Sequence, residues 1–262
     1  MIEREAGWQL YPIGGDTGKA YMGTKDEEKV FLKRNSSPFL AALSLEQITP
    51  RLIWTKRVEN GDVLTAQEWC NGRTLSDSEM GSRQVADILS RVHQSQTLRR
   101  MLERVGGKTV YASHLLEDLY FNLSPDLQSH PTIALVFNHL VDSLDQIENL
   151  RQIRASHGDV SCDNLLLSDQ GKLYLVDWDS AILADPANDL GQLFARYIDI
   201  DDWQAWYEDQ LLPVSSVMKK KIKWYAFLHL LLEIKTAYYK KRYNRLNHLI
   251  LKLDRWQKSL NK

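Results

Sequence analysis

Apolar and polar positions alternate in short runs over the first 70 residues, and glycine-containing or charged turns separate the runs. Such alternation predicts β-strands, because successive side chains of a strand point to opposite faces of a sheet. The stretch 36–45 reads as a short helix, in which Pro38 fits the first turn because no backbone N–H is missed there. The expected strands are 8–13, 19–23, 29–33, 51–57 and 62–68.

Beyond residue 76 the apolar positions repeat every three or four residues, which places one face of a helix against a core. Two short apolar runs, 165–167 and 172–177, interrupt this pattern, and the Ser-Asp-Gln-Gly sequence between them predicts a β-hairpin. We therefore expect an α+β protein with a small β-rich lobe, residues 1–70, and a larger helical lobe, residues 71–262. Besides a helix around 85–92, the expected helices are 113–123, 131–150, 185–198, 202–211, 215–241 and 243–260.

The composition is that of a folded globular chain, with 44% hydrophobic and 26% charged residues among 262. The net charge of −1 argues against a nucleic-acid partner that the whole chain would coat. The charges are unevenly spread, because residues 215–262 hold 13 Lys and Arg but only 2 Asp and Glu. We interpret this basic segment, which includes Lys221, as solvated helix faces, with binding of a phosphate-bearing ligand or an acidic partner as the alternative.

Two cysteines are too few for a disulfide framework, and no apolar run reaches the length of about 18 residues that a membrane span needs. The first residues also lack the basic start and apolar stretch of a signal peptide. These observations lead us to expect a cytoplasmic protein without a membrane span.

Acidic and amide residues flank the predicted hairpin on both sides. Asp159 and Asn164 precede its first strand, and Asp177 ends its second. Because one tight turn joins the two strands, the three side chains should converge on one point. A carboxylate can accept the proton of an attacking hydroxyl, while carboxylate and amide oxygens are ligands that Mg²⁺ prefers. The sequence therefore predicts phosphoryl transfer from a metal-bound nucleotide.

The motifs H-G-D-x-x-x-x-N at 157–164, V-D-W-D at 176–179 and D-P-x-x-D-L at 185–190 resemble the aminoglycoside phosphotransferase and choline kinase superfamily. This resemblance implies a two-lobed, protein-kinase-like fold, with ATP and Mg²⁺ as cofactors. More narrowly, the strings at 14–18, 31–40 and 54–57 resemble those of CcrZ-type (YtmP-like) kinases of Gram-positive bacteria. That family is associated with cell-cycle control and with phosphorylation of ribose and 2-deoxyribose.

The resemblance implies roles for residues of the motif region. Asp159 is the expected catalytic base, and Asn164 and Asp177 are the expected catalytic ligands of Mg²⁺. His157 is grouped with these catalytic residues but is expected to organise the loop rather than to transfer protons. Asp189 is its expected buried partner and supports the loop structurally.

The N-terminal lobe supplies the expected nucleotide contacts. Lys33 ends the third strand, where a lysine of a kinase-like fold reaches the α- and β-phosphates. The helix 36–45 contains no glutamate that could pair with this lysine, and Glu46 is the nearest. Glu68 and Cys70 belong to the hinge, the segment that is expected to join the two lobes. Their backbone groups are expected to contact adenine. The turn that should cover the phosphates contains Gly14, Gly15, Thr17 and Gly18.

The acceptor is expected to bind in the helical lobe, opposite Asp159. A pentose acceptor is expected, together with a cell-division or replication-control protein as a possible partner. Two alternatives stay open: a kinase for choline, another amino alcohol or an aminoglycoside, and a nucleotide-sensing scaffold that acts through protein contacts. The candidate acceptor residues are Asp159, Trp178, Asp179, Arg196, Trp224, His229 and Glu233.

Overall fold

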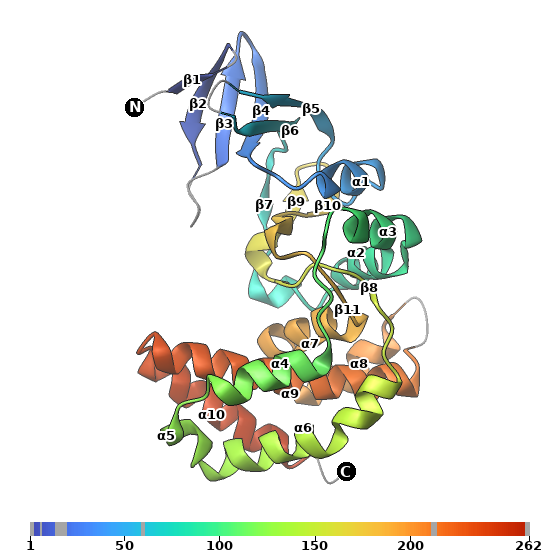
Figure 1. The fold of residues 1–262 in the computed structure, drawn as a ribbon, viewed down its shortest axis with the longest axis vertical. Helices are drawn as coiled ribbons and strands as arrows, with labels where there is room; N and C mark the ends of the chain where they lie inside the picture. Colours follow the sequence, from blue (N-terminus) through green and yellow to red (C-terminus); the bar gives the residue numbers. More distant parts are fainter. Residues whose placement is uncertain (1–2, 6, 14–19, 59–60, 211–213, 260–262) are drawn as a thin grey trace.

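A computed structural model describes residues 3–5, 7–13, 20–58, 61–210 and 214–259 (Figure 1). A β-sheet formed by the N-terminal part lies at one end of the long axis, and the longest helices lie at the other. The small strands and helices between them carry the predicted motifs. The expected α+β architecture with a β-rich N-terminal part and a helical C-terminal part is confirmed.

The N-terminal sheet is antiparallel and has the strand order β1-β2-β3-β4-β6-β5. One face buries alternate apolar side chains, among them Leu10, Leu32 and Leu64, as the period of two predicts. All five expected strands are present, and β1 is an addition that the sequence analysis missed. The bounds are Glu3–Glu5 for β1, Trp8–Pro12 for β2, Ala20–Lys25 for β3, Glu28–Arg34 for β4, Leu52–Arg57 for β5 and Val63–Glu68 for β6.

The helix α1, Phe39–Leu45, follows β4 in the chain but packs in the hydrophobic core of the helical part. Its buried side chains, Phe39, Ala42 and Leu43, join that core rather than the cluster beneath the sheet. The sequence analysis assigned this helix to the N-terminal lobe because of its position in the chain. Its apolar face contacts the larger core instead, so the helix connects the two parts.

Two small sheets, one of three strands in the order β10-β9-β7 and one of two strands, β11 and β8, hold the motif residues (Figure 1). The predicted hairpin is present, although its second strand ends two residues earlier than expected. Its first strand also pairs with β7, which the sequence analysis missed, as it missed β8 and β11. Runs of three residues are too short for an alternation pattern to reveal. The bounds are Gly72–Thr74 for β7, Arg154–Ser156 for β8, Leu165–Ser168 for β9, Leu173–Leu175 for β10 and Ile182–Ala184 for β11.

The helical part is built around α7 and α9, which pack closely against each other. Gly191 of α7 permits this approach, because a Cβ atom there would lie 2.5 Å from the Cβ atom of Tyr225 on α9. The helices are α2 Arg83–Gln94, α3 Gln96–Arg104, α4 Ala112–Phe121, α5 Pro125–Gln128, α6 Pro131–Asn149, α7 Pro186–Tyr197, α8 Trp203–Glu208, α9 Ser216–Tyr239 and α10 Tyr243–Gln257.

The interpretation of α9 as a helix with a solvated basic face was wrong at Lys221, whereas the neighbouring Lys220 is exposed. Residues from Ile222 to Leu231 are almost all buried, because α7, α10 and α6 pack against the helix. Lys221 is only 2% exposed, and its Nζ atom lies 2.7 Å from the Asp185 carboxylate. In the described part of the chain, none of the helices has the length and apolar character needed to cross a bilayer.

Candidate active site

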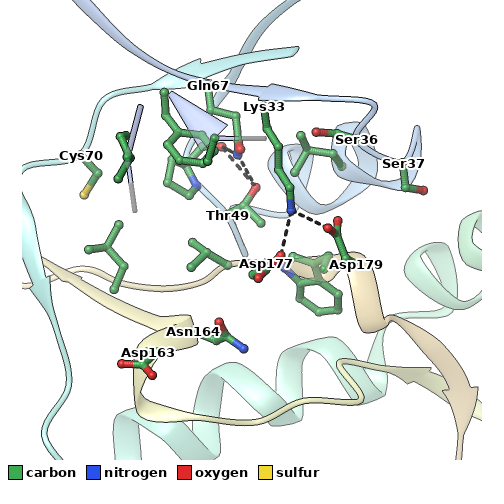
Figure 2. A pocket seen from close by; sticks show the side chains of 18 of the residues that line it. Lys33, Ser36, Ser37, Thr49, Gln67, Cys70, Asp163, Asn164, Asp177 and Asp179 are labelled. Carbon is green, nitrogen blue, oxygen red and sulfur yellow. Dashed lines mark hydrogen bonds and ion pairs between the residues drawn. The ribbon is translucent and has the colours of Figure 1, made fainter. Parts of the chain in front are cut away.

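A cavity of about 750 Å³ lies between the N-terminal sheet and the strands that carry the motifs. Both parts of the molecule line it, and Figure 2 shows Lys33 and Gln67 above Asn164 and Asp177. Asp159 lines the same cavity. The structure thus brings together the three residues around the hairpin that the sequence predicted to converge.

Asp177 follows β10 and has a left-handed backbone conformation, with φ 60° and ψ 68°. Asp is one of the few side chains that visit this region, and the turn directs the carboxylate into the cavity (Figure 2). Its Oδ1 atom lies 2.8 Å from Lys33 Nζ, and Asp179 Oδ2 lies 2.9 Å from the same nitrogen. Burial alone would lower the pKa of Lys33, but the hydrogen bonds and charges of the two carboxylates outweigh it and raise the pKa.

These ion pairs identify the partner of Lys33, which the sequence left open. Glu46 lies at the C-terminal end of α1, where its carboxylate accepts a 2.6 Å hydrogen bond from Ser95 Oγ. The Glu46 carboxylate therefore contacts the helical part and does not pair with Lys33. In this structure the carboxylates come from the turn after β10, on the opposite wall of the cavity.

Asn164 lies in the loop formed by residues 157–164, and contacts within this loop fix the orientation of its amide. Its Nδ2 atom donates to the main-chain oxygen of Asp159 at 2.9 Å and lies 3.4 Å from a carboxylate oxygen of the same residue. The nitrogen is therefore used inside the loop, and Oδ1 is the atom left for a cation.

One face of α7 holds the loop in place through residues spaced three and four apart. Asp189 accepts hydrogen bonds from the main-chain nitrogens of His157 and Gly158, at 2.8 and 3.0 Å. Gln192 bonds the Gly158 oxygen and the Val160 nitrogen. Gly158 has φ 82°, a conformation that favours glycine. The sequence analysis overlooked Gln192, although its spacing from Asp189 was a usable signal.

Asp189 is buried and contacts His157 as expected, but through the His157 main-chain nitrogen and not through its ring. Its carboxylate lies 2.8 Å from Nε2 of His93 on α2, whereas the His157 ring bonds the loop backbone. Burial alone would raise the pKa of Asp189, but the hydrogen bond and electrostatic attraction of His93 and the Gly158 amide lower it.

His157 is fully buried and does not line the cavity. Its Nε2 atom lies 2.9 Å from the Val176 carbonyl, and Nδ1 accepts a 3.3 Å bond from the Asp159 main-chain nitrogen. Because a carbonyl only accepts, the Nε2 atom carries the proton. The two ring nitrogens therefore hold the Val176 carbonyl and the Asp159 main-chain nitrogen in place. This agrees with a role of His157 in organising the loop and not in transferring protons.

Arg196, the next residue along this face of α7, contacts the expected base directly. Its Nη1 atom lies 3.0 Å from Asp159 Oδ1 and 2.8 Å from the Val160 oxygen, and its Nε lies 3.1 Å from Glu233. Arg245 binds the other oxygen of Glu233 at 2.9 Å. Burial alone would raise the pKa of Glu233, but the two arginines lower it. Two acceptor candidates, Arg196 and Glu233, thus form a charged chain that ends at Asp159, but neither is among the residues that line the cavity.

Two other acceptor candidates are in the wrong place, because they belong to the core of the helical part. Trp224 Nε1 donates to the Leu140 oxygen at 3.1 Å, and His229 Nε2 lies 2.9 Å from Asn188 Oδ1. Burial lowers the pKa of His229 to about 3. Neither side chain lines the cavity. Aromatic and histidine residues at helical spacing are packed here, as such residues commonly are.

The remaining candidates line the cavity or lie outside the described residues. Trp178 and Asp179 contribute to the wall beside Lys33, while Glu68 and Cys70 line it where the sheet ends. Burial raises the pKa of the Cys70 thiol. The four residues of the predicted phosphate-covering turn, Gly14, Gly15, Thr17 and Gly18, are not among the described residues.

The residues of the cavity fit Mg²⁺ as an ion that arrives with a nucleotide. Within the described ranges, no group of three or more His, Cys, Asp or Glu side chains could hold a metal. Mg²⁺ is commonly bound through one or two protein ligands plus substrate phosphates. The Asn164 amide oxygen and the Asp177 carboxylate meet this requirement.

A lysine from a sheet, opposite a carboxylate and an amide from a loop and hairpin, is typical of enzymes that transfer a phosphoryl group from a nucleotide. The chain belongs to the phosphotransferase enzyme family, whose model matches residues 23–212. The predicted class of phosphotransferase is therefore confirmed.

Solved structures with the same fold include choline kinase LicA from Streptococcus pneumoniae, with 19% identity and a TM-score of 0.62. The alignment covers 94% of this chain and 92% of that one. An aminoglycoside phosphotransferase from Alicyclobacillus acidocaldarius has 14% identity and a TM-score of 0.64, with coverage of 99% and 91%. The GDP complex of aminoglycoside 2′-phosphotransferase-IIIa has 12% identity and a TM-score of 0.61, with coverage of 99% and 94%. The expected kinase-like fold is thus confirmed.

Proposed function

We propose that this protein is an ATP- and Mg²⁺-dependent kinase that phosphorylates a hydroxyl of a small sugar, ribose or 2-deoxyribose. The observation that carries the proposal is the single cavity shared by Lys33, Asp159, Asn164 and Asp177. The resemblance of the strings at 14–18, 31–40 and 54–57 to CcrZ-type kinases supports the pentose and a role in bacterial cell-cycle control.

The surroundings of Asp159 favour a neutral acceptor over a cationic one. A choline site would need an aromatic cage, and an aminoglycoside site would need a strongly acidic cleft. Here the guanidinium of Arg196 lies 3.0 Å from Asp159 Oδ1, and the neutral amide of Asn164 lies 3.4 Å from the other carboxylate oxygen. A positive charge at this position repels an ammonium group that approaches Asp159, whereas a sugar hydroxyl can approach the carboxylate without that penalty. This repulsion is confined to the surroundings of Asp159. Three more carboxylates line the cavity, those of Asp163, Asp177 and Asp179.

Each residue of the proposed site then has a defined role. Lys33 binds the phosphates, because nucleotide oxygens can replace the carboxylates that it contacts in this structure. Asn164 and Asp177 hold Mg²⁺, which neutralises charge on the phosphate oxygens when bound. Asp159 orients the acceptor hydroxyl and takes its proton. Arg196 positions Asp159, and His157 and Asp189 fix the loop around it.

An acceptor panel tests the proposal. The purified protein is incubated with Mg²⁺ and γ-labelled ATP plus D-ribose, 2-deoxy-D-ribose, choline or kanamycin, and labelled products are separated. We expect label on a pentose and none on the two cations. Labelled choline or kanamycin without labelled pentose would assign the alternative kinase class, and absence of all transfer would favour the nucleotide-sensing scaffold.

We expect Arg196→Met to lower kcat by roughly 10- to 100-fold, because hydrogen bonds to charged groups contribute about 1.5–3 kcal/mol. The KM for ATP should change little, since Arg196 contacts the base and not the nucleotide side of the cavity. Steady-state kinetics with the pentose separates the two constants.

Two further variants test whether the effect on kcat depends on the charge and the position of the Arg196 side chain. Arg196→Lys keeps the charge and one donor, so it should recover part of the loss. Arg245→Met removes only the second contact of Glu233, so its effect should be smaller. Equal losses in all three variants would contradict the positioning role of Arg196.

A further inference from the structure

Gln67 is a buried polar side chain at the end of β6, directly before the segment 68–70 that borders the cavity. It is 8% exposed and lines the cavity on the side opposite Asn164 and Asp163 (Figure 2). The sequence pattern indicates only backbone contacts with the base and therefore no role for this side chain.

The amide orientation of Gln67 follows from its neighbours. Nε2 lies 2.9 Å from the Pro50 main-chain oxygen and 3.3 Å from Thr49 Oγ1. A carbonyl oxygen only accepts, so the nitrogen end of the amide must face Pro50. The Thr49 hydroxyl is 3.2 Å from the same carbonyl and donates to it, which leaves its oxygen free to accept from Gln67.

The other end of the amide is therefore fixed as an acceptor. Within the described part of the chain, no residue donates a hydrogen bond to Gln67 Oε1. This oxygen is open to the cavity that Gln67 lines, where a ligand that supplies an N–H can take the place of water. A 180° rotation of the amide would turn the Nε2 donor toward the cavity. This rotation is unfavourable, because it would point Oε1 at the Pro50 oxygen.

We propose that Gln67 selects a 6-aminopurine nucleotide, and this inference rests on the proposed use of a purine nucleotide in this cavity. An adenine amine has two hydrogens: the backbone oxygen of Glu68 takes one, and Gln67 Oε1 takes the other. A 6-oxopurine such as guanine would place its own carbonyl oxygen toward Oε1, and two acceptors repel each other. Thr49 and Pro50 act as the residues that hold the amide in the selective orientation.

Calorimetric binding of three diphosphates tests this role without relying on turnover. The probes are ADP, GDP and purine riboside 5′-diphosphate, which lacks any substituent at position 6. The wild type should bind ADP roughly 5- to 150-fold tighter than the purine riboside compound, because the 6-amino group makes two hydrogen bonds of about 0.5–1.5 kcal/mol each. Its preference for ADP over GDP should be larger, because repulsion is added.

Gln67→Met keeps a side chain of similar length but has no amide oxygen. It should bind the purine riboside compound as well as the wild type does, which also shows that the variant is folded. Its preference for ADP over that compound should fall to roughly 2- to 10-fold, because only the hydrogen bond to the Glu68 oxygen remains. Thr49→Val leaves Gln67 in place but loosens the amide, so its preference should be intermediate.

The outcomes separate this proposal from the proposed function. A preference for ADP over purine riboside diphosphate that is unchanged in both variants would overturn the role of Gln67 and leave the nucleotide site intact. Wild-type protein that binds none of the three diphosphates would instead contradict the use of a purine nucleotide. A GDP preference in the wild type would overturn the selectivity directly.

Discussion

Asp159→Asn is expected to slow phosphoryl transfer to the acceptor by about 10²- to 10⁴-fold, the usual contribution of a general base. The amide oxygen of asparagine can still accept the hydrogen bond that Arg196 donates to Asp159, so the loop should keep its shape. What is lost is the ability to take the hydroxyl proton. Nucleotide affinity should stay close to that of the wild type, because Lys33, Asn164 and Asp177 are untouched.

Single-turnover kinetics and calorimetry with ADP measure these two quantities separately. Asp163→Asn is the matched control, because Asp163 lies in the same loop and lines the same cavity. Its carboxylate makes no hydrogen bond or ion pair with any residue of the described ranges, so we expect little change in rate. Asp159→Asn protein that transfers phosphate at the wild-type rate would exclude Asp159 as the base.

The sequence predicted those parts of the site whose geometry depends on residues that are close together in the chain. Asp159, Asn164 and Asp177 lie on either side of one hairpin, so a short stretch of chain was enough to bring them together. The strands of the N-terminal sheet were predictable for the same reason, because an alternation of period two appears within each strand. Such features depend on neighbours that are close in sequence.

The sequence failed where contacts join distant segments. His93 and Asp189 are 96 residues apart, and nothing in the pattern around either residue points to the other. Trp224 and His229 were assigned to the acceptor site because their side chains can bind sugars, but tertiary packing buries them between helices. The role of Thr49 and Pro50 in orienting Gln67 also needs coordinates, because a β-strand and a loop must be placed against each other first.

The contact between His93 and Asp189 leads to the second large effect, which is on stability. Asp189→Ala leaves three buried donors without an acceptor: His93 Nε2 and the main-chain nitrogens of His157 and Gly158. At about 1–3 kcal/mol for each unsatisfied donor, we expect the free energy of unfolding to fall by at least about 3 kcal/mol. Urea denaturation at neutral pH measures this change. Asp142→Ala, at an exposed position of α6, is the control and should stay within about 0.5 kcal/mol of the wild type.

The pH dependence tests whether the charge of Asp189 is responsible. Its pKa in the folded protein lies below the ordinary value, so the folded state favours the carboxylate and gains stability from it at neutral pH. This gain is complete above the unfolded pKa of about 3.9 and is lost as the pH falls through the lower folded pKa. The difference in unfolding free energy between the wild type and Asp189→Ala should therefore be largest at neutral pH and shrink below about pH 4. A difference that stays constant down to pH 3 would mean that the loss comes from the cavity left by the side chain rather than from its charge.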